Sequence, residues 1–243
     1  MEWEPRRNAE CFCGSGLRFR ECCGSLAEDR PPPRGLHVIE GYLDADKCRQ
    51  LVEYADTRSG EPLMVVDTAA TTANKVVRKL DPGRVTEQVD LGPRQAELEG
   101  IVRRTFIDVI EPAIAARIEW FETPQLLRYR TGGFYKGHAD SDRFDPATST
   151  WAKVLDRDVS MLLYLNDAYT GGALSFPGFH YTLRPRPGML VFFPSDRRYY
   201  HTAEPVLSGI RYAAVSWAAF RDVPKIHSGP TSAALSLHGK TSA

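Results

Sequence analysis

The stretch LLRYRTGGFYKGHAD, residues 126–140, joins two β-type runs through Thr-Gly-Gly and ends on a histidine and an aspartate one residue apart. Because side chains alternate faces along a strand, His138 and Asp140 should project from the same face, about 7 Å apart along the strand. A nitrogen and a carboxylate oxygen that point the same way can occupy two neighbouring positions on a metal ion. The stretch therefore predicts a β-rich region that carries a metal site.

Further β-type runs surround this stretch, and the region before them is helical. After residue 119 the runs are separated mostly by Gly, Pro, Asn, Asp or Ser; they are EWFETPQLLRYR, GFYKGHAD, DVSMLLYLN, GALSFPG, GMLVFFPS, YYHTAEPV and GIRYAAVSWAAF. Earlier, Asp44 is expected to cap a helix over 45–57, and apolar residues recur at helical spacing over 94–111, where Pro112 should end or kink the helix. Helices followed by strands indicate an α+β protein whose second half is a β-sandwich or barrel.

The composition is that of a folded protein without a dominant charge. The chain has 243 residues, 42% hydrophobic and 26% charged, with 31 basic and 31 acidic residues. The zero net charge gives no electrostatic case for a nucleic acid or an anionic membrane as the main partner. No apolar run approaches the length of a membrane span. The first thirty residues are polar and Arg-rich, without a secretion signal, so we expect a cytoplasmic location.

Composition also divides the chain into four segments. Residues 8–25 contain four of the five cysteines, and residues 26–35 form a Pro-rich linker. The main domain is expected over 36–222. Residues 223–243 are rich in Ser, Gly, Thr and Ala, which predicts a disordered tail.

The cysteine cluster CFCGSGLRFRECCG places Cys11 and Cys13 eight residues before the adjacent pair Cys22 and Cys23. Four thiolates in so short a segment can surround one tetrahedral zinc ion. A disulfide is the weaker interpretation, because adjacent cysteines cannot pair without strain and the expected compartment is reducing. The stretch closely resembles the small zinc-binding motif at the C-terminus of the bacterial secretion ATPase. That resemblance implies a structural zinc and a role in docking a protein.

A third ligand for the metal at His138 and Asp140 is expected from His201, in RRYYHTAEP, which lies in a later strand that can close a barrel. Two histidines and one carboxylate on one side of an octahedron form the facial triad of non-haem iron(II) oxygenases. The alternative is an exposed polar strand face, since Asp142 and Arg143 follow directly.

Arg211 follows His201 by ten residues, in the otherwise apolar GIRYAAVSW. Burying an arginine costs several kcal/mol unless an anion pairs with it. A planar guanidinium suits a carboxylate, so we expect an anionic small molecule near the metal. An inter-strand ion pair with an aspartate or glutamate is the alternative.

The order of these features resembles the prolyl 4-hydroxylase-like branch of the iron(II)/2-oxoglutarate dioxygenases. The matching segments are LLRYRTGGFYKGHAD (126–140), VSMLLYLNDAYTGGALSFP (159–177) and PRPGMLVFFPSDRRYYHTAEPVLSGIRYAAVSW (185–217). Residues 36–118 match only as generic helix-and-strand support. The implied fold is an α+β double-stranded β-helix, or jelly roll, with supporting helices and a small zinc-binding knot before it.

The resemblance implies that His138, Asp140 and His201 bind iron(II). It also implies that Arg211 pairs with the distal carboxylate of 2-oxoglutarate.

Two tyrosines stand where the family has residues of the cosubstrate pocket. Tyr164 corresponds to a tyrosine that hydrogen-bonds the same carboxylate, and Tyr129 to one nearby; core packing is the alternative for both. The chain departs from the family at Ala173, after the Gly-Gly pair, where an acidic or threonine side chain is frequent. Some prolyl hydroxylases have lysine in place of Arg211. These departures weaken the assignment of a substrate, not of the chemistry.

The resemblance implies hydroxylation of a C–H bond with iron(II), 2-oxoglutarate and O2 as cosubstrate, besides a structural zinc; it also suggests ascorbate. Three functions remain open: a hydroxylase of a prolyl or other residue in a protein or peptide partner, an oxygenase of a free amino acid or natural product, and an inactive binding module of the same fold. The complete triad and Arg211 argue against the inactive module. The docking-like knot favours the protein hydroxylase.

Overall fold

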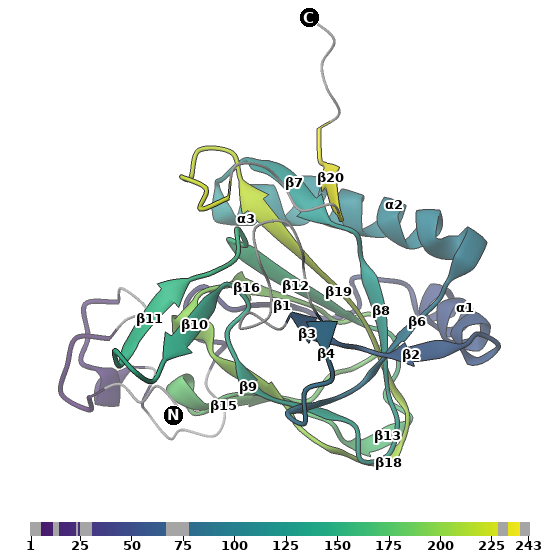
Figure 1. Cartoon of the computed structure of the whole chain (residues 1–243), viewed down its shortest axis with the longest axis horizontal. Helices are drawn as coiled ribbons and strands as arrows, with labels where there is room; N and C mark the ends of the chain where they lie inside the picture. Colours follow the sequence, from purple (N-terminus) through teal and green to yellow (C-terminus); the bar gives the residue numbers. More distant parts are fainter. Residues whose placement is uncertain are drawn as a thin grey trace, which may run out of the picture.

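The β-type runs of the second half form two antiparallel sheets (Figure 1). The protein is described from a computed structural model, which covers residues 6–11, 15–22, 24, 31–66, 78–227 and 233–238. The larger sheet has nine strands in the order β1-β16-β12-β19-β8-β6-β2, with β7 pairing both β19 and β20. Its strands are β1 His37–Ile39, β2 Gly60–Pro62, β6 Glu87–Val89, β7 Ile118–Glu122, β8 Gln125–Tyr129, β12 Val159–Tyr164, β16 Leu190–Pro194, β19 Arg211–Phe220 and β20 Ala234–Ser236.

The smaller sheet has five strands in the order β15-β14-β17-β9-β5. They are β5 Arg84–Val85, β9 Phe134–His138, β14 Leu174–Phe176, β15 Tyr181–Leu183 and β17 His201–Ala203. Three strand pairs complete the described structure. These are β3 Val65–Val66 with β4 Arg78–Lys79, β10 Asp142–Asp145 with β11 Thr150–Lys153, and β13 Tyr169–Gly171 with β18 Val206–Gly209.

Helix α1 (Ala45–Asp56) begins at the predicted N-cap. The Asp44 carboxylate accepts hydrogen bonds from the backbone N–H groups of Asp46 and Lys47, at 2.9 and 3.2 Å. These bonds satisfy donors that a helix start leaves without an intrahelical partner. Four 3₁₀ turns also occur in the described residues: η1 Phe19–Glu21, η2 Gly92–Arg94, η4 Pro177–Phe179 and η5 Arg197–Tyr199.

The second helical region continues past Pro112, so of the two expected alternatives, an end or a kink at that proline, the end is wrong. Helix α2 (Gln95–Thr105) passes through a π-helical segment, η3 (Phe106–Ile110), into α3 (Glu111–Ile114). Pro112 occupies one of the first positions of α3. A proline is tolerated there because its missing N–H would have no intrahelical partner in a first turn.

Strand alternation separates two cores on opposite faces of the larger sheet. Along β12, Met161 and Leu163 belong to a cluster that includes residues of α1 and α2, while Tyr164 belongs to a cluster that includes the smaller sheet. The helices therefore cover the outer face of the larger sheet, and the smaller sheet covers its inner face. This arrangement agrees with the predicted α+β jelly roll and places every inward side chain between the two sheets.

The N-terminal segment packs on the jelly roll. Phe19 is 3% exposed and its ring lies 6.1 Å from that of His180. Cys11 is buried in the same inter-sheet cluster, and Cys22 packs against that cluster. Cys13 and Cys23 lie outside the described residues. Near the end of the predicted linker, the Tyr199 hydroxyl donates to the Arg34 carbonyl at 2.7 Å.

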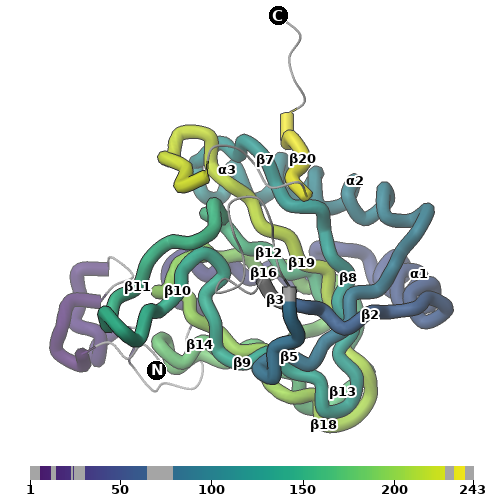
Figure 2. Tube along the Cα trace, in the orientation of Figure 1, coloured from purple at the N-terminus to yellow at the C-terminus, as the bar shows by residue number. Residues whose placement is uncertain are grey.

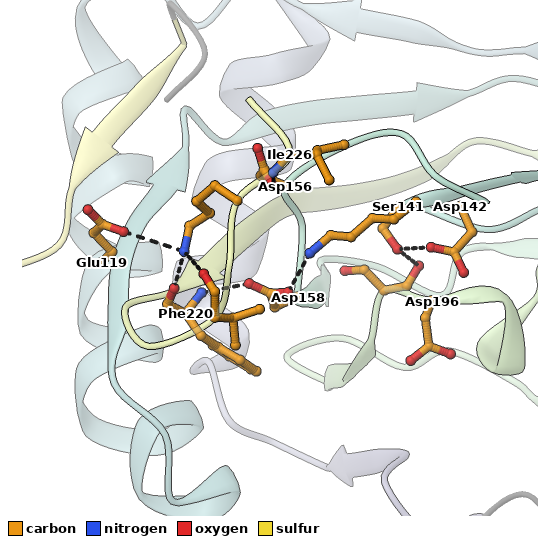
Figure 3. A network of polar contacts seen from close by, with 12 residues as sticks. Glu119, Ser141, Asp142, Asp156, Asp158, Asp196, Phe220 and Ile226 are labelled. Carbon is orange, nitrogen blue, oxygen red and sulfur yellow. Dashed lines mark hydrogen bonds and ion pairs between the residues drawn. The ribbon is translucent and has the colours of Figure 1, made fainter. Parts of the chain in front are cut away.

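Part of the predicted disordered tail forms a strand. β20 pairs with β7, and Leu237 is 2% exposed. The expectation is wrong at these residues because β7 offers a strand edge and Leu237 reaches the core beside the helices. The loop after β19 is also held: in Figure 3, Asp158 accepts the N–H of Phe220 and Asp156 accepts the N–H of Ile226, both at 2.8 Å.

Among the residues described, no helix combines the length and the apolar character needed to cross a membrane.

Candidate active site

Strand pairing brings the two predicted histidine ligands together. β17 pairs with β9 in antiparallel register, with His201 opposite His138. The two ring centroids lie 4.2 Å apart. The strand β9 ends at His138, so Asp140 reaches the site from the segment just beyond the strand and not from its face, as the spacing had suggested.

The segment after His138 is fixed by Ser195. The N–H groups of Asp140 and Ser141 both donate to the Ser195 carbonyl, at 3.1 and 2.9 Å. The Ser141 hydroxyl bonds the same carbonyl and also donates to Asp142, as Figure 3 shows. Arg157 donates to the Asp140 carbonyl at 3.3 Å. Asp140 is therefore held by its backbone on the side away from the histidines.

The three side chains converge. His138 Nε2 lies 3.6 Å from Asp140 Oδ1, and His201 Nε2 lies 3.8 Å from Asp140 Oδ2. The potential ligand atoms of all three residues lie within 4.8 Å of one another. Two ligands at about 2.1 Å from one metal and at right angles are about 3 Å apart. Small side-chain rotations thus suffice to bring these atoms to one ion.

Both imidazoles are oriented for binding through Nε2. His138 Nδ1 lies 3.0 Å from the Lys136 carbonyl, and His201 Nδ1 lies 2.9 Å from the Tyr199 carbonyl. A carbonyl can only accept, so each Nδ1 carries the proton and each Nε2 presents its lone pair. A hydrogen bond from Nδ1–H to a backbone carbonyl is usual for a histidine that binds a metal through Nε2.

The charge states also suit a metal. Burial, followed by the neighbouring His201, lowers the pKa of His138 to about 3, so this ring is neutral at physiological pH. Burial alone would raise the pKa of Asp140, but His201, His138, Arg157 and the Ser160 hydroxyl together outweigh burial and leave that pKa below its ordinary value. A neutral imidazole and a carboxylate are the forms that coordinate cations.

The carboxylate of Asp140 has a hydrogen-bond partner that the sequence did not suggest. The Ser160 hydroxyl donates to Asp140 Oδ2 at 2.7 Å and lies 2.7 Å from the Ser195 hydroxyl. The available signal was the alternation of β12, which puts Ser160 on the same face as Leu162 and Tyr164. Only the tertiary structure shows that Asp140 lies opposite.

Arg211 is buried without a carboxylate. It is 2% exposed, it donates to the Gly172 carbonyl at 2.6 Å, and its guanidinium lies 4.0 Å from the centre of the Tyr129 ring. Its Nε is buried with no hydrogen-bond partner. Among the described residues no aspartate or glutamate forms an ion pair with it, so the inter-strand pair considered from the sequence is absent there.

Two predicted tyrosines and one unexpected tyrosine surround Arg211. Register places Tyr129 directly opposite Arg211, and Tyr164 opposite Ala213. Burial raises the pKa of Tyr164 above its ordinary value, with Arg211 acting in the opposite direction. Tyr169 was missed: its hydroxyl is buried without a partner, and burial raises its pKa to about 12. Its position just before Thr170 and the Gly-Gly pair was the only sequence signal.

One cavity contains the predicted residues together. Its lining includes His138, Asp140, His201, Arg211, Tyr129 and Tyr164. Two imidazole nitrogens and a carboxylate meet at one point, and the Arg211 guanidinium, whose Nε has no hydrogen-bond partner among the described residues, lines the same cavity. These residues therefore fit an iron(II) ion with an organic acid beside it.

Comparison with known proteins finds two family models that match parts of the chain. Residues 124–219 match the 2OG-Fe(II) oxygenase superfamily, and residues 7–25 match the SEC-C motif. The chain is 27% identical over 232 residues to prolyl 4-hydroxylase subunit alpha-1 of Gallus gallus, which covers 87% of this chain and 45% of that protein. It is 33% identical over 231 residues to the subunit alpha-1 of Rattus norvegicus, covering 89% of this chain and 41% of that protein. The chain thus spans less than half the length of these relatives.

A prolyl-4-hydroxylase from Pseudomonas putida has a similar fold. Its crystal structure has a TM-score of 0.53 with 24% identity, and the match covers 77% of this chain and 93% of that one. The region matched to the 2OG-Fe(II) oxygenase superfamily, residues 124–219, contains the triad and Arg211. Residues 124–219 therefore form a domain that matches the 2OG-Fe(II) oxygenase superfamily, a SEC-C motif match precedes it, and most of the chain is similar to prolyl 4-hydroxylases.

Proposed function

We propose that this protein is an iron(II)- and 2-oxoglutarate-dependent hydroxylase of a prolyl or other residue in a protein or peptide partner. The observation that supports it most is the meeting of three ligand atoms beside a buried guanidinium with an unmet donor. The similarity to prolyl 4-hydroxylase subunits supports the choice of a peptide residue over a free amino acid or natural product.

Each residue of the triad has a defined task in this proposal. His138 and His201 hold iron(II) through Nε2, and Asp140 holds it through its carboxylate. Iron(II), with 2-oxoglutarate and O2, supplies the oxidising power that hydroxylates a C–H bond and releases succinate and carbon dioxide. The backbone carbonyls on both Nδ1 atoms keep the rings from turning away during turnover.

Arg211 and the tyrosines around it bind the cosubstrate. Arg211 presents its unmet Nε to the distal carboxylate of 2-oxoglutarate, and Tyr164 donates to the same group. The Tyr129 ring stacks against the Arg211 guanidinium and holds it in its orientation. The low dielectric of this buried position strengthens the pairing of opposite charges.

The proposal is tested by turnover of the full chain with candidate peptides. Succinate release is measured with iron(II), 2-oxoglutarate and O2, with and without prolyl peptides, and products are examined by mass spectrometry for one added oxygen atom. Stimulated succinate release with a hydroxylated peptide supports the proposal. Hydroxylation of free amino acids alone would favour the alternative oxygenase, and binding without any turnover would favour the inactive module.

Ser160 positions Asp140, so replacing it should weaken metal binding. In Ser160→Ala the Asp140 carboxylate loses the bond to Oδ2 and can rotate. We expect the affinity for iron(II) or cobalt(II) to fall about 10- to 100-fold, as is usual when the partner of a metal ligand is removed. Metal affinity is measured by anaerobic titration, and circular dichroism monitors the fold.

Ser216→Ala is the matched control, because Ser216 is also a buried serine and donates to the Glu122 carbonyl. Metal affinity should be unchanged in this variant. Equal losses in Ser160→Ala and Ser216→Ala would show that sheet stability, and not the position of Asp140, controls the affinity.

The N-terminal knot is proposed to hold one structural zinc ion through Cys11, Cys13, Cys22 and Cys23 and to dock a protein. The SEC-C match and the burial of Cys11 support this role. A four-cysteine site is closed, so it contributes to folding and not to catalysis. Residues 8–25, 26–35 and 36–222 remain the proposed divisions, with a cytoplasmic location and ascorbate as further predictions.

Zinc content tests the knot separately from the iron site. The purified chain should retain one zinc after mild chelation removes iron, and Cys11→Ser should lose it, with a lower melting temperature, because metal binding and folding are coupled. Elemental analysis measures the zinc. Cys48→Ser is the control, since Cys48 is buried in α1 and should not affect zinc. Zinc retained in Cys11→Ser would contradict this ligand set.

A further inference from the structure

Arg84 is a second guanidinium at the active-site cavity. It is the first residue of β5, where it pairs with Tyr135 of β9, and Figure 2 shows these strands side by side. It lines the same cavity as His138 and Arg211. Its guanidinium lies 4.3 Å from the centre of the Tyr135 ring, which in turn stacks 3.7 Å from the His138 ring. Arg84 therefore lies one aromatic ring away from a metal ligand.

The residues that the structure describes do not use the hydrogen-bonding capacity of the Arg84 side chain. Its Nε is buried without a partner. In the described part of the chain its side chain forms no ion pair and no hydrogen bond, only the contact with Tyr135. Asp81 and Glu87, the acidic residues nearest in sequence, form no ion pair with Arg84 in the described structure: Asp81 accepts the Gly83 N–H at 2.7 Å, and Glu87 pairs with Arg128 and Arg130. The neighbouring Lys136 adds a second positive charge near Gly83.

The charges of the loaded cavity leave Arg84 unbalanced. Iron(II) and Arg211 would together carry three positive charges, and the two carboxylates of 2-oxoglutarate with Asp140 would together carry three negative charges. Both histidines bind as neutral rings. One positive charge remains at Arg84, which lines the cavity, whereas the Arg211 guanidinium donates to the Gly172 carbonyl. A partly buried cation gains most from a partner of opposite charge.

We propose that Arg84 binds a carboxylate of the substrate, placed close to the carbon that is hydroxylated. The proposal rests on the proposed function, and it names the substrate class: a residue flanked by aspartate or glutamate, or a free amino acid that supplies its own carboxylate. A single carboxylate neutralises the remaining charge, whereas a phosphate dianion would exceed it. The planar carboxylate can also accept two parallel hydrogen bonds from the guanidinium.

Matched ligand pairs test this assignment by binding. The full chain is loaded anaerobically with iron(II) and 2-oxoglutarate. Prolyl peptides with Glu or Asp one or two residues from the proline are compared with the same peptides carrying Gln or Asn, and L-proline is compared with L-prolinamide. At least one acidic ligand should bind about tenfold or more tightly than its amide partner. The peptide and free amino acid pairs identify the source of the carboxylate.

Variants show whether Arg84 is responsible. The preference for acid should disappear in Arg84→Gln and return partly in Arg84→Lys, while Lys136→Gln keeps it. The affinity for 2-oxoglutarate should stay unchanged in Arg84→Gln, which also shows that the variant is folded.

Two outcomes overturn the proposal: no ligand pair shows a preference for acid, or the preference persists in Arg84→Gln. The proposed hydroxylase function fails separately, since an acidic peptide could bind through Arg84 and still gain no oxygen when O2 is admitted.

Discussion

Asp140→Ala is expected to abolish iron(II) binding and hydroxylation without unfolding the protein. Asp140 supplies the only negative charge among the three convergent ligands, and its carboxylate lies 3.6 and 3.8 Å from the two histidine Nε2 atoms. Removing it leaves two imidazole ligands on the neighbouring strands β9 and β17. Metal affinity should fall by more than about 100-fold, because removing even a hydrogen-bond partner of a metal ligand typically lowers metal affinity about 10- to 100-fold.

The comparison that isolates this effect uses Asp167→Ala. Asp167 is exposed, forms no side-chain hydrogen bond in the described structure and does not line the cavity, so its loss removes one negative charge outside the metal cluster. Iron binding is followed by anaerobic titration and turnover by succinate release, with thermal unfolding measured in parallel. Asp140→Ala with near-normal iron affinity would show that the cluster is not the iron site.

Arg211→Met should separate cosubstrate binding from metal binding. Arg211 is buried, makes one hydrogen bond to Gly172, and leaves Nε without a partner. Truncating one partner of a buried charge pair typically costs about 2–5 kcal/mol. The affinity for 2-oxoglutarate should therefore fall by roughly 30- to 4000-fold, while the affinity for iron(II) stays within about threefold, because Arg211 is not a ligand. Arg211→Lys keeps the positive charge but not the planar guanidinium, so its affinity for 2-oxoglutarate should lie between that of the unchanged protein and that of Arg211→Met.

Arg128→Met is the matched control for this substitution. Arg128 is another buried arginine of the larger sheet, but it pairs with Glu87 at 2.6 Å and donates to the Ala55 and Arg58 carbonyls near α1. Its loss should lower the melting temperature and leave 2-oxoglutarate affinity of the folded protein intact. If both variants lost iron and 2-oxoglutarate binding to the same extent, misfolding would explain the results instead.

The sequence predicted the residues of the site better than their surroundings. His138, Asp140, His201 and Arg211 were identifiable because a metal triad and a lone arginine in an apolar strand are unusual combinations. Their partners depend on strand register, which the local pattern does not determine. Ser160 and Arg84 therefore look like ordinary strand residues until β12 and β5 are placed beside the cavity.

The same limit explains the errors in the fold. Asp44 was correctly expected to cap α1, because capping depends only on residues within one helical turn. Pro112 was expected to end or kink a helix, and the helix does not end there, because the π-helical segment η3 leads into α3. The strand at Ala234–Ser236 was missed because its pairing with β7 joins residues more than a hundred positions apart.

The most direct test of the site is an anaerobic titration of the full chain with iron(II) and 2-oxoglutarate, followed by visible absorption. We predict one iron and one 2-oxoglutarate per chain at this site, with charge-transfer absorption that requires both and is lost in Asp140→Ala. Absence of that absorption in a folded, zinc-containing protein, with neither iron nor 2-oxoglutarate bound, would contradict the assignment of the triad and of Arg211.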